Sequence, residues 1–161
     1  MEIKDLKKLV EHPTFRKEGS DYVKVLEPIS VTEVVSLENI YNSGQQFPVA
    51  LRELLLLAGN DCYVLDYGLN DSQAEMQGSS RAYLTSFGRN YCITRPFFVI
   101  DVYNAGTQFL FVYLDEDQED PIVYEAYMDE AYPNWIESVG GTLSSLIKHR
   151  MVRLLSGRNP F

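Results

Sequence analysis

The chain has 161 residues, of which 45% are hydrophobic and 23% charged. This composition is typical of one folded domain with a sizeable core, and it excludes global disorder. The formal net charge of −9 argues against a nucleic-acid partner, because binding to phosphates requires a basic face. The same charge suits a basic protein partner, although an acidic surface also serves solubility alone.

The N-terminal part of the sequence predicts a helix, a short strand and a second helix. Apolar residues at helical spacing predict the first helix over residues 3–11, and a mixed polar segment with a short strand at 22–26 follows it. Ser30 or Thr32 is suited to cap the second helix, with Glu33 near its start.

A third helix, over residues 47–60, carries the clearest apolar stripe of the chain. Pro48 suits its first turn, because proline lacks the N–H that would be unpaired there. Gly59 is expected to end the helix in a left-handed conformation. Burial of each leucine of the stripe contributes about 2 kcal/mol, so this helix is expected in the core. The segment 62–66 then predicts a short strand, and 71–90 predicts a helix weakened at its central glycine.

Residues 97–126 predict three consecutive strands. The segments 97–101 and 107–114 are joined by a tight turn, and 122–126 follows an acidic loop. Both faces of 107–114 are apolar, so this strand is expected at the centre of a sheet covered on both sides.

A last helix is expected over residues 143–151, capped by Thr142, and its basic tail is expected to fray. Taken together, the elements predict an α+β fold with a mainly antiparallel sheet flanked by helices. No linker or repeat divides the chain, so we expect a single domain over residues 1–161.

The cysteines and the apolar runs bear on the compartment. Cys62 and Cys92 have no metal-ligand spacing and are expected to be buried free thiols, with one disulfide left open. Residues 1–10 carry charge throughout, unlike a signal peptide. The longest apolar run, 54–58, is too short to span a bilayer. These features predict a cytoplasmic protein with no membrane association.

The acidic loop, residues 115–120, lies between the strands predicted at 107–114 and 122–126, and it is the first candidate site. Calcium binding is one interpretation, but the loop lacks the central glycine and distal glutamate of an EF-hand. A solvated turn and an electrostatic docking edge for a basic partner are the others. The predicted partner-binding carboxylates are Asp115, Glu116, Asp117, Glu119 and Asp120.

Aromatic residues follow the loop closely. Tyr124 and Tyr127, with Tyr132 and Trp135 further on, give the composition of a protein-binding patch, in which rings anchor and charges orient. The alternative is that these rings pack beneath the C-terminal helix. We add Tyr124 and Tyr127 to the predicted partner-binding residues.

No catalytic motif is present in the sequence. His12 and His149 lie near opposite ends of the chain, with no nucleophile motif beside either, and Cys62 follows a helix instead of preceding one. The adjacent glycines at 140 and 141 belong to no phosphate-binding motif and indicate a turn. We therefore predict a protein that is not an enzyme and needs neither a cofactor nor a metal.

Several short pieces occur in a distinctive order over residues 29–152, with the helix at 3–11 added before them. They are a helix at 29–41 starting with Thr32-Glu33, Phe47-Pro48, the apolar helix 51–58, Gly59-Asn60, the strands 97–101 and 109–114, Asp120-Pro121 before a strand at 123–124, and the late helix 143–151. This order resembles the SUKH superfamily, which includes Smi/Knr-type fungal cell-wall regulators and many bacterial immunity proteins. The chain departs from the family at Asp61-Cys62, where a second glycine is often found.

The resemblance implies an α+β domain that, in bacteria, binds a toxin of nuclease or deaminase type and blocks its active site. An acidic surface would then imitate the phosphates that a basic toxin groove accepts. The alternative is a regulatory protein-interaction module of the Smi/Knr cell-wall and glucan-synthesis type. An enzyme or metal-dependent protein with a site assembled from scattered residues is the third possibility. The resemblance transfers no contact residue, and the oligomeric state stays open.

Overall fold

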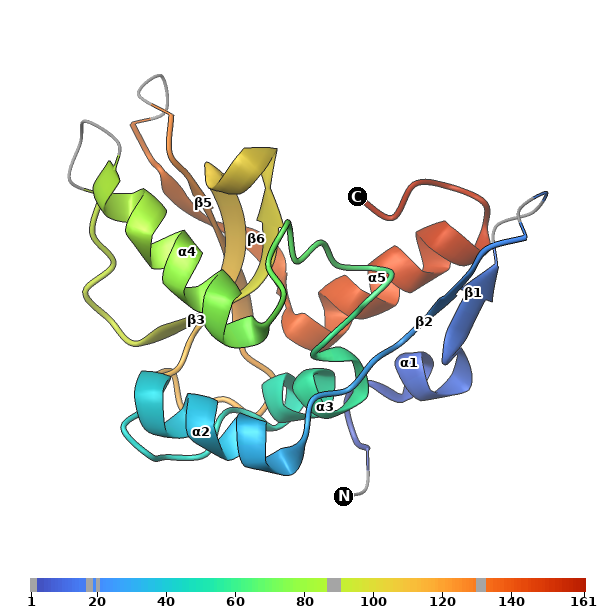
Figure 1. The fold of residues 1–161 in the computed structure, drawn as a ribbon. Coiled ribbons are helices and arrows are strands. Elements are labelled where there is room, and N and C mark those ends of the chain that lie inside the picture. Colours follow the sequence, from blue (N-terminus) through green and yellow to red (C-terminus); the bar gives the residue numbers. More distant parts are fainter. Residues whose placement is uncertain (1–2, 17–18, 20, 87–90, 130–132) are drawn as a thin grey trace.

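The structure is a computed structural model that describes residues 3–16, 19, 21–86, 91–129 and 133–161 (Figure 1). The elements in chain order are α1 (Lys7–Glu11), β1 (Thr14–Arg16), β2 (Val23–Val25), α2 (Val31–Tyr41), α3 (Val49–Ala58), α4 (Gln73–Ser86), β3 (Phe97–Tyr103), η1 (Asn104–Gly106), β4 (Gln108–Tyr113), β5 (Ile122–Tyr127), β6 (Ile136–Thr142) and α5 (Leu143–Leu155).

The strands form two antiparallel sheets. β3, β4, β5 and β6 pair in sequence order, and β1 pairs with β2 in a separate two-stranded ribbon. The predicted α+β class with an antiparallel sheet is confirmed. The segment 107–114 was expected at the centre of the sheet, and β4 lies between β3 and β5 as that expectation requires.

Helices cover both faces of the larger sheet (Figure 1). Phe98 and Leu110 point to the face that packs with α2, α3 and α5. Val99 and Phe109 point to the opposite face, where Met76 of α4 is fully buried. Because alternate side chains of a strand point to opposite faces, this double cover explains the continuous apolar run of β4.

The start of α2 is a capping box. The Ser30 hydroxyl accepts a hydrogen bond from the Glu33 N–H at 3.2 Å, and the Glu33 carboxylate accepts one from the Ser30 N–H at 2.8 Å. Ser30, and not Thr32, is therefore the cap. Each partner satisfies an N–H that the first helical turn leaves unpaired.

Gly59 ends α3 for a reason other than the expected one. Its φ of −70° is right-handed, so the prediction of a left-handed conformation was wrong. A Cβ at this position would lie 2.5 Å from the Leu55 carbonyl oxygen and 2.9 Å from Cγ1 of Ile29. The glycine is needed for space, because the segment before α2 crosses closely over the end of α3.

Two predictions between α3 and β3 need correction. Residues 62–65 form a turn, closed by the Leu65 N–H donating to the Cys62 carbonyl at 3.0 Å, and they are not a strand. All four are buried, and an apolar run without alternation does not distinguish a strand from a buried turn. α4 is continuous through Gly78, since the buried side chain of Gln77 bonds to the backbone of Val99 and fixes the helix on the sheet.

The two ends of the chain also differ from expectation. α1 starts only at Lys7, because the N–H groups of residues 4–6 bond to the buried carboxylate of Glu53. The sequence did not predict β6, because its paired glycines were interpreted as a turn. Thr142 caps α5 as predicted, but the tail does not fray: the Arg153 side chain donates to the Asn159 carbonyl at 2.8 Å.

The structure also locates the two thiols and bears on membrane association. Cys62 and Cys92 are both free, and Cys62 is buried as expected, whereas Cys92 is exposed. None of the helices in the described part of the chain is long and apolar enough to cross a membrane.

Candidate functional site

The acidic loop, residues 115–120, connects β4 to β5, and its first carboxylates are paired. The Arg95 guanidinium donates to Asp115 at 2.6 Å and reaches Glu116 at 3.4 Å. It lies 3.8 Å above the ring of Tyr113. The hydrogen bond from Arg95 lowers the pKa of Asp115. The one positive charge of Arg95 therefore compensates part of the negative charge of Asp115 and Glu116 at the start of the loop.

Glu116 is held from its other side by Tyr124. The Tyr124 hydroxyl donates to Oε1 of Glu116 at 3.0 Å, and its ring packs against Phe111 and Tyr113. Burial and the bond to Glu116 raise the pKa of Tyr124. Tyr124 thus belongs to the aromatic cluster on the α4 side of the sheet and does not pack beneath α5.

Asp120 closes the loop by binding the start of α5. Its carboxylate accepts hydrogen bonds from the Ser144 N–H at 2.9 Å and from the Ser144 hydroxyl at 2.6 Å. An acidic side chain here satisfies an N–H of the first helical turn and complements the helix dipole. Asp120 therefore has a structural role that its position in a loop did not indicate.

The centre of the loop is the part that faces solvent. Glu119 pairs with Lys4, and both side chains are more than half exposed, while the Glu119 carbonyl accepts the Ala50 N–H at 2.9 Å. Asp117 is exposed, with a left-handed φ of 51°. It is the one carboxylate of the loop with no hydrogen bond or ion pair to a described residue among the interactions found.

A hollow of about 240 Å³ lies beside the loop. The loop residues 116–119 form one wall, and the connection between α2 and α3, including Gln45 and Gln46, forms the other. No lysine or arginine lines it within the described part of the chain. The hollow combines carboxylates with side-chain amides, and both accept hydrogen bonds from a cationic group.

The structure does not bring every predicted site residue to this surface. Tyr127 lies at the far end of β5, opposite Gln108, roughly 17 Å along the strand from its start at Ile122 at about 3.4 Å per residue. Trp135 is half-buried against Tyr91, with ring centroids 4.9 Å apart. Tyr132 falls outside the described residues.

The sequence interpretation missed three residues of the site. Gln45 and Gln46 line the hollow beside the loop although they are far from it in the sequence. Arg95 is paired with Asp115, which is 20 positions away. No local pattern indicates such contacts, because helical and strand periodicity report burial and not which charged residues meet.

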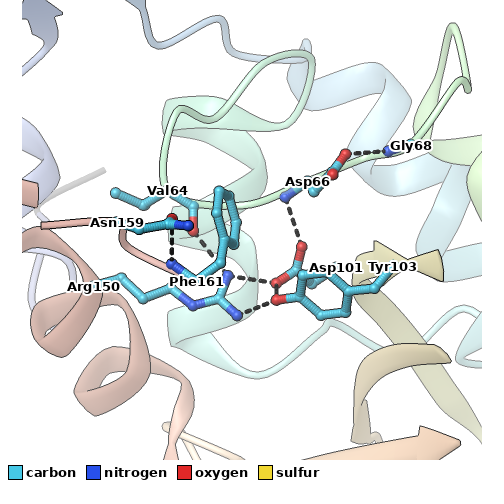
Figure 2. A network of polar contacts seen from close by, with 8 residues as sticks. All are labelled: Val64, Asp66, Gly68, Asp101, Tyr103, Arg150, Asn159 and Phe161. Atoms are coloured by element: carbon cyan, nitrogen blue, oxygen red, sulfur yellow. Dashed lines mark hydrogen bonds and ion pairs between the residues drawn. The ribbon is translucent and has the colours of Figure 1, made fainter. Parts of the chain in front are cut away.

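A buried polar network lies between α5 and β3, on the face of α5 that points away from solvent (Figure 2). A register irregularity between Val99 and Asp101 turns Asp101 toward α5, where Arg150 donates to its carboxylate. Tyr103 donates to the same carboxylate, and the Asp66 N–H donates at 2.6 Å. Burial raises the pKa of Asp101 to about 6, despite these donors.

The network has the features of a structural connection. Its charged members are enclosed, with Asp101 at 0% and Arg150 at 6% exposure, and Arg150 also donates to the Val64 carbonyl at 2.8 Å. It therefore ties α5, β3 and the turn at 62–65 together, and a substrate has no open position beside the carboxylate. From the sequence, Arg150 was expected only as part of the last helix, over residues 143–151.

Two further results concern metal ligands and known relatives. Within the described ranges, no three histidine, cysteine, aspartate or glutamate side chains are grouped so that they could hold a metal ion. In comparisons with family models, curated proteins and solved structures, nothing matches this chain. The resemblance to the SUKH superfamily therefore stays a prediction.

Proposed function

We propose that this protein is a non-enzymatic binding protein that neutralises a basic toxin domain, of nuclease or deaminase type, by direct contact through the acidic loop. The proposal rests on the SUKH resemblance, the net charge of −9 and the geometry of the loop. The observation that carries it is two exposed carboxylates on a loop fixed at both ends: Asp117, and Glu119, whose one ion pair is with the exposed Lys4.

Fixation of the loop matters for binding. Arg95 holds its start, Ser144 holds its end, and the Ala50 N–H holds the backbone at Glu119. A loop that is already ordered loses little conformational freedom when a partner binds. Its carboxylates then present negative charge at fixed positions, as successive phosphates of a nucleic acid do.

The hollow beside the loop would accept a cationic side chain of the toxin. A lysine or arginine of the toxin groove would extend between Asp117 and the amides of Gln45 and Gln46. Charge complementarity of this kind speeds encounter and excludes wrong partners more than it raises affinity. Occupation of the toxin's groove by this surface would deny the groove to its nucleic-acid substrate.

The test has two steps. Proteins captured by the tagged chain are first eluted with salt, and a basic toxin domain is purified from the eluate. The decisive step then measures how strongly the chain inhibits this toxin domain. The variant combines Asp117→Asn with Glu119→Gln and spares Asp115 and Asp120, and asparagine tolerates the left-handed backbone at position 117. The matched control combines Asp71→Asn with Glu137→Gln, which are exposed elsewhere and change the net charge equally.

We expect the wild-type chain and the control to inhibit the toxin at equimolar amounts, and the loop variant to require at least about tenfold more protein, the equivalent of about 1.4 kcal/mol. Equal inhibition by all three would place the interface elsewhere. Capture of enzymes or signalling proteins of the host, without a toxin, would favour the regulatory module instead.

A further inference from the structure

A second cavity lies between the β1–β2 ribbon and the C-terminal tail, and it shares no lining residue with the hollow at the acidic loop. Its volume of about 490 Å³ is within the range of small-molecule sites, which is roughly 300–1,000 Å³. Neither the proposed toxin contact nor the buried network makes use of this cavity.

Aromatic rings form most of its apolar wall. Phe15 lies in β1, and Tyr22 directly precedes β2. Tyr63 lies in the buried turn at 62–65, and Phe161 lies in the C-terminal tail. Phe15 and Tyr63 contact each other with centroids 5.8 Å apart. Phe161 remains 49% exposed, so a ring in the cavity has an open aromatic surface on which to pack.

The charges at the cavity are positive. Lys24 and Arg158 line it from opposite segments, and among the described residues no aspartate or glutamate does so, although the chain has 23 of them. The salt bridges found between described residues involve neither cation. Because no aspartate or glutamate of the described residues lies beside these two cations and the aromatic walls, the cavity favours an anionic ligand.

The cavity is built into the fold. Gly157 adopts a left-handed φ of 75°, which reverses the chain after α5, and Arg153 donates to the backbone oxygens of Asn159 at 2.8 Å and Phe161 at 3.3 Å. The ring of Phe161 then lies against Tyr103, with centroids 6.1 Å apart, and beside Arg150 (Figure 2). The tail wall is therefore in place before any ligand arrives.

We propose that this cavity binds a small molecule with an aromatic ring system and an attached anionic group. The ring packs among the aromatic walls, and the anion lies between Lys24 and Arg158. The anionic group would compensate the positive charge that Lys24 and Arg158 bring to this cavity. This site is independent of the toxin contact proposed above.

Two fluorescent probes with the same ring system test the proposal. 1-Anilinonaphthalene-8-sulfonate carries a sulfonate, and N-phenyl-1-naphthylamine is its neutral counterpart. We expect the anionic probe to bind the folded protein with a stoichiometry of one and to raise its melting temperature. Replacement by Lys24→Gln with Arg158→Gln should weaken the anionic probe at least about tenfold and leave the neutral probe unchanged.

Two variants separate the cavity from the rest of the surface. Phe161→Ala should weaken both probes, because it removes a wall, and Asp117→Asn at the acidic loop should weaken neither. The proposal is overturned if the anionic probe binds the cation variant as tightly as the wild type. It is equally overturned if neither that probe nor 4-nitrophenyl phosphate, a smaller aromatic anion, binds the folded protein.

Discussion

Asp101 and Arg150, 49 residues apart, form an ion pair inside the protein, between β3 and α5. Removal of one member leaves a buried charge without its partner, which costs about 3–5 kcal/mol. We therefore expect Arg150→Met to lower the free energy of unfolding in urea by about that amount. The double variant Arg150→Met with Asp101→Leu should recover a substantial part of the loss. A loss below about 1 kcal/mol in the single variant would mean that the pair is solvated.

Asp101 should also give the stability a distinctive dependence on pH. Its pKa is raised from 3.8 to about 6 in the folded state, so the folded protein binds this proton more tightly than the unfolded chain. Stability contributed by a raised carboxyl pKa falls as the pH rises from about 4 to about 6, and the effect then levels off. Urea unfolding of the wild type and of Asp101→Asn at several pH values measures the difference. An increase of the wild-type advantage with pH over this window would contradict the assignment.

Asp120 should contribute to stability, whereas Asp117 should not. Asp120→Ala removes both acceptors of Ser144 at the start of α5, and loss of a helix-capping contact costs about 1 kcal/mol. Asp117→Asn lies in the same loop and keeps a side chain that tolerates the left-handed backbone, so we expect it to change stability by less than about 0.5 kcal/mol. Thermal unfolding of both variants is the comparison. If the two variants melt at the same temperature, the contacts of Asp120 with Ser144 do not stabilise the protein.

Glu53 should hold the N-terminal segment on the domain. Its side chain is fully buried and accepts N–H groups from Lys4, Asp5 and Leu6. Glu53→Ala leaves these donors without an acceptor, so the segment should detach and its amides should exchange with solvent. We expect hydrogen exchange to lose protection over residues 4–11 and to keep it in the four-stranded sheet. If the amide of Leu6 keeps its protection in this variant, contacts other than Glu53 hold the N-terminal segment on the domain.

The two cysteines should differ sharply in reactivity. Burial raises the pKa of Cys62 to about 12, and the thiolate is the reactive form. Cys92 is exposed. Titration of the native protein with a disulfide reagent should modify one thiol, and denaturation should release a second. The variant Cys92→Ser should show no fast reaction, and a fast reaction there would mean that the turn around Cys62 opens readily.

Local sequence signals predicted those elements whose determinants are local. The serine and glutamate of the capping box, the leucine stripe of α3 and the apolar runs of β3 and β4 each carry their own signal within a few residues. β6 does not, because two glycines weaken strand propensity and pairing with β5 overrides it.

The candidate site was predictable only in part for the same reason. The concentration of carboxylates at 115–120 is visible in the sequence, and so is their place in a strand connection. Which of them have partners depends on Arg95, Lys4 and Ser144, which approach from other elements. Sequence proximity therefore identified the loop but assigned equal roles to carboxylates whose contacts differ in the fold.

The three attachments of the acidic loop would have a kinetic consequence for the partner binding proposed above. A loop fixed by Arg95, Ala50 and Ser144 would need little rearrangement before it contacts a basic partner. Added salt would then slow the association of a basic partner steeply while its residence time changes little. Release of Arg95 would reverse this balance, because encounter would have to wait for the loop to order itself.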